Sequence, residues 1–278
     1  MKKSILLLLT VFLLGLSCSK AKDYEEIAPN NGGSTPPPVV TPTWKVIFED
    51  NFEDNTLNSS WSNCPRRTSD WNKYIENNAQ TLEVKNGLLM LRAIVNPDKS
   101  ENAVAYLTSG IKTERKVNIK YGKIEVRAKF SKTGQGAWPA IWMMPEDQSS
   151  GWPACGEIDI MERLNSDNIF YQTVHSHYVT TLGIKNDPVY SKKVSFSTNE
   201  FNTYGIEWYE DRISFTFNGT VTFTYPKIVT TKEGQWSFDK PFYLILNQAA
   251  GGGWPGSVNP SHLPFEMQVD WVKFYQLQ

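Results

Sequence analysis

Apolar and polar residues alternate with a period of two along several segments of the chain, most clearly at residues 123–130. Successive side chains of a β-strand point to opposite faces, so this alternation predicts a strand with one face on a core and one charged face. The apolar positions are Ile124, Val126, Ala128 and Phe130, and the charged positions are Lys123, Glu125, Arg127 and Lys129.

Two further alternating segments, residues 213–217 and 220–225, flank Asn218 and Gly219. Both residues tolerate positive φ, which a two-residue type I′ turn requires, so the pattern predicts an antiparallel hairpin. Residues 242–247 and 267–275 also have strand patterns, and no stretch of twelve or more residues carries a helical stripe. Together these patterns predict an all-β fold of two packed antiparallel sheets.

The first residues of the chain have the layout of a secretory signal. Residues 1–17 contain two lysines, an apolar stretch too short to span a bilayer, and small residues at the end. Leu-Ser-Cys-Ser around Cys18 resembles a bacterial lipoprotein signal, in which the cysteine becomes the lipidated N-terminus, although Gly15 stands where such signals usually carry Leu. We expect an exported protein with an acyl anchor on the outer membrane at the cell surface. The alternatives are a periplasmic or simply secreted protein.

Residues 18–43 are polar and then rich in Gly, Ser, Thr and Pro, which predicts a flexible tether. An apolar run begins at Trp44, and no second linker follows it. All-β domains commonly reach this size as one unit, so residues 44–278 are expected to form a single domain.

Composition narrows the choice of partners. The net charge is −1, and the lysines and arginines are dispersed, which argues against a nucleic acid partner. The chain contains 10 Trp, 12 Tyr and 14 Phe, and this aromatic excess suits a protein that binds sugars. We expect contact with the membrane through the lipid anchor only, and a monomer.

Three acids and no cation lie within residues 157–162, Glu-Ile-Asp-Ile-Met-Glu. On a strand, Glu157 and Asp159 share one face, and the isoleucines between them share the other. Strict alternation would place Glu162 on the apolar face. A β-bulge at the extra residue Met161 would return Glu162 to the acidic face.

An ordinary solvated strand face is the simplest interpretation of these acids. Their crowding favours a second interpretation, because like charges oppose ionisation and can keep one carboxyl protonated near neutral pH, as an acid catalyst requires. Retaining glycoside hydrolysis uses such a pair, a nucleophile and a proton donor with carboxyl groups about 5–5.5 Å apart. Glu157 and Glu162 are the candidates.

The segment closely resembles the active-site signature of glycoside hydrolase family 16, in the bulged form typical of laminarinase-like members. The resemblance extends over the domain, through the segments Tyr-Gly-Lys-Ile-Glu-Val-Arg-Ala-Lys (121–129), Trp-Pro-Ala-Ile-Trp-Met-Met-Pro (138–145), Phe-Tyr-Leu-Ile-Leu-Asn (242–247), Gly-Gly-Gly-Trp-Pro-Gly (251–256) and Gln-Val-Asp-Trp-Val (268–272).

This resemblance implies a concanavalin A-like β-jelly roll with a concave substrate cleft. It implies that Glu157 is the nucleophile, Glu162 the acid/base and Asp159 a residue that tunes the nucleophile. The implied partner is a polysaccharide substrate. The implied activity is a retaining endo-β-glucanase on β-1,3- or mixed-linkage β-1,3/1,4-glucan that needs no cofactor for the chemistry. Related enzymes cut agar, carrageenan or other galactans with the same acids, so a galactan hydrolase is the alternative.

The resemblance also implies substrate-binding residues at Trp138, Trp142, His175, Asn247 and Trp254, where indole faces stack on pyranose rings. A weaker candidate is Trp152, which precedes the acids in a loop. Many members carry an arginine in the strand before Tyr121, and residues 109–113, Ser-Gly-Ile-Lys-Thr, show no clear equivalent.

Many family members bind one structural calcium ion, and the resemblance places its ligands at Asp270, Gly87 and Glu49. Oxygen ligands are appropriate for calcium, and a plain surface acid at Asp270 is the alternative. Cys64 and Cys155 would meet in an oxidising compartment, where a disulfide is one option and two structural thiols are the other.

Two rival functions use the same residues. His175 and His177 alternate on one strand face and, with Glu162, could hold a transition metal in a cupin-type enzyme. A non-catalytic glycan-binding lectin could share the fold, since fold alone does not decide function. The complete set of acids argues against a lectin, which needs neither nucleophile nor proton donor.

Overall fold

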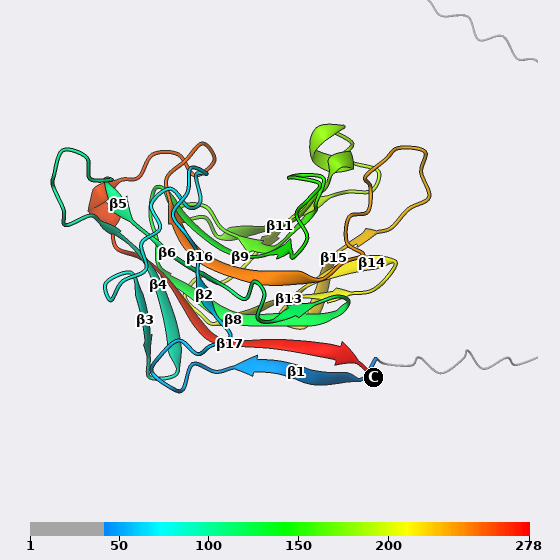
Figure 1. Cartoon of the computed structure of the whole chain (residues 1–278), viewed down its shortest axis with the longest axis horizontal. Coiled ribbons are helices and arrows are strands. Elements are labelled where there is room, and N and C mark those ends of the chain that lie inside the picture. Colours follow the sequence, from blue (N-terminus) through cyan, green and yellow to red (C-terminus); the bar gives the residue numbers. More distant parts are fainter. Residues whose placement is uncertain (1–41) are drawn as a thin grey trace, which may run out of the picture. The chain divides into compact units, whose positions relative to one another are not determined.

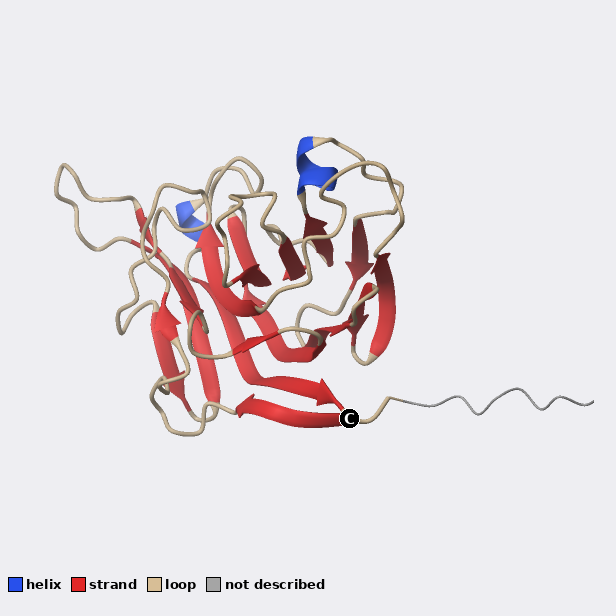
Figure 2. Cartoon of the chain, turned by 45° about the vertical axis from the view of Figure 1, so that its right-hand side comes forward, coloured by secondary structure: helices blue, strands red, loops and turns tan. Residues whose placement is uncertain are grey.

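Two antiparallel β-sheets, packed face to face, form the part of the chain that this computed structural model describes, residues 42–278. Figure 1 shows the sheets as curved layers, and Figure 2 shows that strands make up most of the fold, with short helical segments among the loops. This confirms the predicted jelly-roll architecture. The signal sequence, Cys18 and almost all of the tether lie outside the described residues.

The first sheet has nine strands, in the order β15-β14-β13-β8-β17-β4-β3, with β1 paired to β17 and β5 to β4. The second has eight, in the order β12-β11-β10-β9-β16-β6-β2, with β7 paired to β16. The strands are β1 (Trp44–Asp50), β2 (Ser62–Asn63), β3 (Leu82–Lys85), β4 (Leu88–Val95), β5 (Tyr106–Leu107), β6 (Ser109–Lys112), β7 (Asn118–Ile119), β8 (Gly122–Lys132), β9 (Ala137–Pro145), β10 (Glu157–Glu162), β11 (Ile169–His175), β12 (Ser191–Ser195), β13 (Asn202–Trp208), β14 (Arg212–Phe217), β15 (Thr220–Pro226), β16 (Phe242–Ala250) and β17 (Phe265–Leu277).

Two short helices lie in loops, a π-helix η1 (His177–Thr181) and a 3₁₀-helix η2 (Pro260–His262). Within residues 42–278, no helix is long and apolar enough to cross a membrane. The β14–β15 hairpin turns at Asn218 and Gly219, whose φ angles are +49° and +77°. The predicted type I′ turn explains these positive values.

Alternation in β8 sets which side of the first sheet meets the second. Ile124, Val126, Ala128 and Phe130 are all at most 2% exposed and belong to the main core between the sheets. In β16, all nine residues are buried, because the strand has the core on one face and cleft-side residues on the other. In the second sheet, one face packs against the first sheet. The opposite face carries the side chains of the candidate site.

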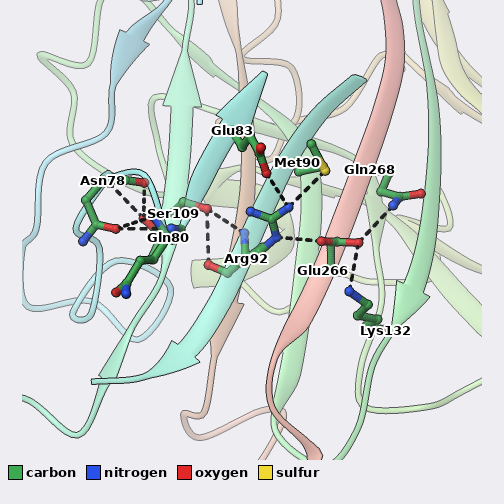
Figure 3. A network of polar contacts seen from close by, with 10 residues as sticks. Asn78, Gln80, Glu83, Met90, Arg92, Ser109, Lys132, Glu266 and Gln268 are labelled. Atoms are coloured by element: carbon green, nitrogen blue, oxygen red, sulfur yellow. Dashed lines mark hydrogen bonds and ion pairs between the residues drawn. The ribbon is translucent and has the colours of Figure 1, made fainter. Parts of the chain in front are cut away.

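A buried charge is neutralised where β17, β4 and β3 meet (Figure 3). The Glu266 side chain is only 4% exposed, and its Oε2 lies 2.6 Å from Arg92 Nε. Arg92 also reaches Glu83 at 2.9 Å, and Lys132 lies 3.7 Å from the other oxygen of Glu266. Arg92 therefore joins three strands through one guanidinium group.

We predict that Arg92→Met lowers the free energy of unfolding by about 3 kcal/mol, because a buried carboxylate loses its main partner. Urea denaturation measures this loss. Arg66→Met is the control: Arg66 and Glu76 pair at the surface, with side chains 39% and 52% exposed, so its loss should stay below about 1 kcal/mol. Equal losses in the two variants would contradict the assignment.

Candidate active site

Strand β10 contains a β-bulge at Ile160 and Met161. Asp159 and Met161 pair with consecutive residues of β9, so Ile160 has no partner there. On the other side, Asp159 and Glu162 pair with residues of β11 that are two positions apart, so Ile160 and Met161 together oppose one residue. The predicted bulge is confirmed, and it spans both residues rather than Met161 alone.

The bulge sends two consecutive side chains into the core. Ile160 and Met161 are both 0% exposed and belong to the main hydrophobic cluster between the sheets. As a result Glu162 lies on the same face as Glu157 and Asp159, and all three line one cleft. A regular strand would have placed Glu162 in the core.

The cleft consists of two adjoining hollows, of about 560 Å³ and about 550 Å³. Trp138, Glu157 and Glu162 line both of them. The first is also lined by Trp71, Trp142, Trp152, Asp159 and Asn247, and the second by Tyr171, His175, Tyr190, Lys193 and Trp254. The two carboxyl groups therefore lie midway along an open groove, which suits a chain that extends past them in both directions.

Each of these two carboxyl groups accepts a hydrogen bond from an indole. Trp152 Nε1 donates to Glu157 Oε2 at 3.0 Å, and Trp138 Nε1 donates to Glu162 Oε1 at 3.0 Å. Trp152 is 56% exposed, so the indole lies over the nucleophile candidate from the cleft side. Trp152, the weaker sequence candidate, thus contacts the site directly.

Burial dominates the protonation of the three acids. It raises the pKa of Glu162 to about 8, with a further increase from the charge of Asp159, while the hydrogen bond from Trp138 opposes the shift. Burial likewise raises the pKa of Asp159 to about 8. The pKa of Glu157 is also raised, by burial first and by the charge of Asp159 second.

The protonation of Glu157 and that of Asp159 are linked, because a hydrogen bond with Glu157 lowers the pKa of Asp159 and the charge of Asp159 raises the pKa of Glu157. The Asp159 side chain is 3% exposed and that of Glu157 is 16% exposed. Trp152 also donates to Glu157, which stabilises a negative charge there. Glu162 is protonated below about pH 8.

The remaining predicted substrate residues also line the cleft. Trp142 Nε1 donates to Asn247 Oδ1 at 2.7 Å, and the Nδ2 of Asn247 has no hydrogen-bond partner among residues 42–278. His175 pairs with Glu157 across the β10–β11 ladder. Trp254 is 45% exposed and packs edge-on against Trp138, with ring centroids 5.8 Å apart.

The loop that carries Trp254 is fixed by backbone contacts. Gly253 N donates to Asp70 Oδ2 at 2.8 Å. Gly252 has φ +145°, and a Cβ there would lie 2.8 Å from the Asp70 side chain. Glycine is needed at position 252 because the loop crosses Asp70 at close range there.

Several cleft residues had no signal in the sequence. Trp71 packs edge-on against Trp142, with centroids 4.9 Å apart, and comes from a loop without a periodic pattern. Lys112 projects into the cleft beside Glu114, with which it forms an ion pair, and lies in the segment where an arginine was sought. Arg67 lines the same hollow. Lys112 reaches the cleft because β6 pairs with β16, which places Lys112 beside Ile245.

The cupin-type ligand set is not brought together. His177 begins η1 and faces Glu233, with Nε2 3.6 Å from Oε1. Within the described residues, the acids and histidine that come close enough to hold an ion are Glu157, Asp159 and His175. The prediction that His177 and Glu162 bind a metal together with His175 is therefore wrong. Strand β11 ends at His175, so His177 does not lie on the same strand face.

Cys64 and Cys155 are both free and buried, so the structural-thiol alternative is the one observed. They belong to one small cluster beneath Trp142. Burial raises the pKa of Cys64 to about 12 and also raises the pKa of Cys155, which disfavours a reactive thiolate.

The predicted calcium ligands have other partners. Asp270 forms an ion pair with Arg127, and Glu49 Oε1 lies 2.8 Å from Lys273 Nζ. Gly87 lies beside the Glu53 side chain and the carbonyl of Asn51. Protein cations neutralise both carboxylates, so these residues do not fit a calcium site as arranged.

We predict that Glu162→Gln stabilises the fold as the pH rises. The folded-state pKa of about 8 lies above the ordinary glutamate value of 4.5, so the unfolding free energy of the native chain falls as the pH rises between these values. Glutamine removes this loss. Thermal unfolding should show no gain near pH 4 and a gain on the order of 1–5 kcal/mol near pH 8.

Glu233→Gln is the control, because the Glu233 side chain is 85% exposed. It should leave the pH dependence of stability unchanged. If Glu162→Gln keeps the native slope between pH 5 and 8, the raised pKa of Glu162 is wrong.

Comparisons with known proteins agree with this geometry. Over 243 residues the chain is 40% identical to a keratan-sulfate endo-1,4-beta-galactosidase of Sphingobacterium multivorum, covering 86% of this chain and 57% of that protein. Over 257 residues it is 30% identical to a beta-glucanase of Rhodothermus marinus, covering 84% of this chain and 86% of that protein. The chain thus spans little more than half of the first relative.

The laminarinase of Rhodothermus marinus has a solved structure that superimposes with a TM-score of 0.74 at 27% identity, covering 85% of this chain and 99% of that chain. The family model described as "Glycosyl hydrolases family 16" matches residues 65–273, which include the whole of β10 and both hollows of the cleft. The chain belongs to glycosyl hydrolases family 16.

Proposed function

We propose that this chain is a retaining endo-β-glycosidase. The observation that carries the proposal is the placement of Glu157 and Glu162 on one cleft face, where the two open hollows meet. Endo action follows from the position of the acids midway along the groove, since a polymer can extend to either side of the bond that is cut.

Glu157 attacks the anomeric carbon and forms a covalent glycosyl-enzyme, while Glu162 gives its proton to the departing oxygen. Glu162 then takes a proton from water, which attacks the same carbon and releases the sugar with its configuration retained. Trp152 donates a hydrogen bond that stabilises the negative charge of Glu157, and Asp159 lies beside Glu157 on the same strand face. The raised pKa of Glu162 suits its first role, because the group is protonated at neutral pH.

We predict that Glu157→Gln lowers hydrolysis by at least about three orders of magnitude, because an amide cannot form the glycosyl-enzyme. Oligosaccharide affinity, measured by calorimetry, should change little, since Trp152 can still donate to the amide oxygen. Glu101→Gln, at an exposed loop position, is the control. Native turnover by Glu157→Gln would rule out the assignment.

For the substrate, we propose β-1,3- or mixed-linkage β-1,3/1,4-glucan. Support comes from the Rhodothermus marinus beta-glucanase and laminarinase, which align along nearly their whole lengths. Indole and phenol rings line both hollows, and such faces can stack on pyranose rings.

A β-galactoside polymer is the second candidate. Two observations favour it: the 40% identity to the keratan-sulfate galactosidase, and three cations along the cleft, Arg67, Lys112 and Lys193. Such cations suit sulfate esters, although Glu114 balances the charge of Lys112.

A panel of laminarin, barley β-glucan, keratan sulfate and desulfated keratan, with product sizing, decides between the two. We predict internal cuts in the glucans with oligosaccharide products. Cleavage of keratan alone would replace the first candidate by the second, and cleavage of none of the four would remove both.

We also propose export with lipidation of Cys18 and attachment to the outer membrane at the cell surface. The layout of residues 1–17 supports this proposal. The protein is proposed to act as a monomer. Cys18→Ser should move the protein from the membrane fraction to the soluble fraction, and an unchanged distribution would argue against the anchor.

A further inference from the structure

The imidazole of His175 lies against two carboxyl groups of the cleft. Its Nε2 is 3.2 Å from Asp159 Oδ2 and 3.7 Å from Glu157 Oε1. One ligand atom from each of the three residues lies within 4.8 Å of the others. Glycoside hydrolysis itself requires no such imidazole, because Glu157 and Glu162 supply the nucleophile and the proton.

The other nitrogen of the ring has its own partner. His175 Nδ1 lies 3.1 Å from Thr180 Oγ1, and Thr180 belongs to η1. When Nδ1 donates its hydrogen to this hydroxyl, the lone pair of Nε2 faces the carboxyl groups. Metal-binding histidines commonly have this arrangement, in which a hydrogen bond at one nitrogen orients the other.

Asp159 has a buried carboxyl oxygen that lacks a hydrogen bond to any residue that the structure describes. Its side chain is 3% exposed, and Oδ2 has no hydrogen-bond partner within residues 42–278, since the approach of His175 does not have hydrogen-bond geometry. A buried carboxyl oxygen without a hydrogen bond is unfavourable. This atom faces the space that Nε2 also faces.

We propose that Glu157, Asp159 and His175 form a zinc site in the cleft, with Glu157 Oε1, Asp159 Oδ2 and His175 Nε2 as ligands. Zinc bonds of about 2.0–2.2 Å in a tetrahedron place ligand atoms about 3.3–3.6 Å apart, close to the two distances to Nε2. Glu157 Oε2 is held by Trp152, which leaves Oε1 for the ion. The open cleft supplies the fourth position.

The ligand set selects the kind of metal. Imidazole with carboxylates suits zinc and its transition-metal neighbours, whereas calcium prefers oxygen ligands alone. Bound zinc would occupy the oxygen of Glu157 and the centre of the cleft. Zinc should therefore inhibit hydrolysis in competition with the substrate. This inhibition rests on the proposed function, whereas zinc binding itself does not depend on it.

Calorimetric titration of the full chain with zinc chloride tests the site. We expect one zinc ion per chain, with affinity lowered more than tenfold by His175→Gln. Thr180→Val should lower the affinity by about tenfold, because it removes the hydroxyl that orients the ring and keeps its shape. His177→Gln is the matched control, since His177 faces Glu233 and is not one of the three ligands, and this variant should bind zinc as the native chain does.

No zinc uptake by the native chain, or equal affinity in His175→Gln and the native chain, would overturn the proposal. The inhibition assay separates this failure from failure of the proposed function. Zinc that binds through His175 but leaves polysaccharide hydrolysis unchanged would support the zinc site and contradict Glu157 as the nucleophile.

Discussion

A strand alternates its side chains between two faces, and the candidate active site depends on one departure from that rule. At the bulge in β10, Ile160 and Met161 both enter the core, where each is fully buried. The burial of two large apolar side chains stabilises the bulge by roughly 1.5–3 kcal/mol for each. Packing between the sheets therefore determines that Glu162 shares a face with Glu157.

The same arrangement has an electrostatic cost. Three carboxyl groups share one buried face, and burial raises the pKa of each. Indole donors from Trp138 and Trp152 offset part of this cost and orient the two outer acids. The raised pKa of Glu162 keeps this carboxyl group protonated at neutral pH, as an acid catalyst requires. Burial of these acids lowers the free energy of unfolding at neutral pH, at the site where the reaction needs them.

Local patterns in the sequence predicted much of this fold. The alternation at residues 123–130, the Asn218-Gly219 turn and the three acids each report on neighbours in the chain, and the structure agrees with all three. Such local patterns do not predict contacts between segments that are distant in the sequence. Trp71 enters the cleft through the path of its loop and Lys112 through sheet register. Asp270 and Glu49 meet protein cations because β17 pairs with both β8 and β1.

The central claim is that the bulge makes Glu157 a nucleophile opposite Glu162. A 2-deoxy-2-fluoro β-glycoside with a good leaving group tests it most directly, because the fluorine slows release of the glycosyl-enzyme. Peptide mapping by mass spectrometry should then find one sugar attached to Glu157. A sugar on Asp159 or Glu162, or a chain that turns over substrate and is never labelled, would contradict the account.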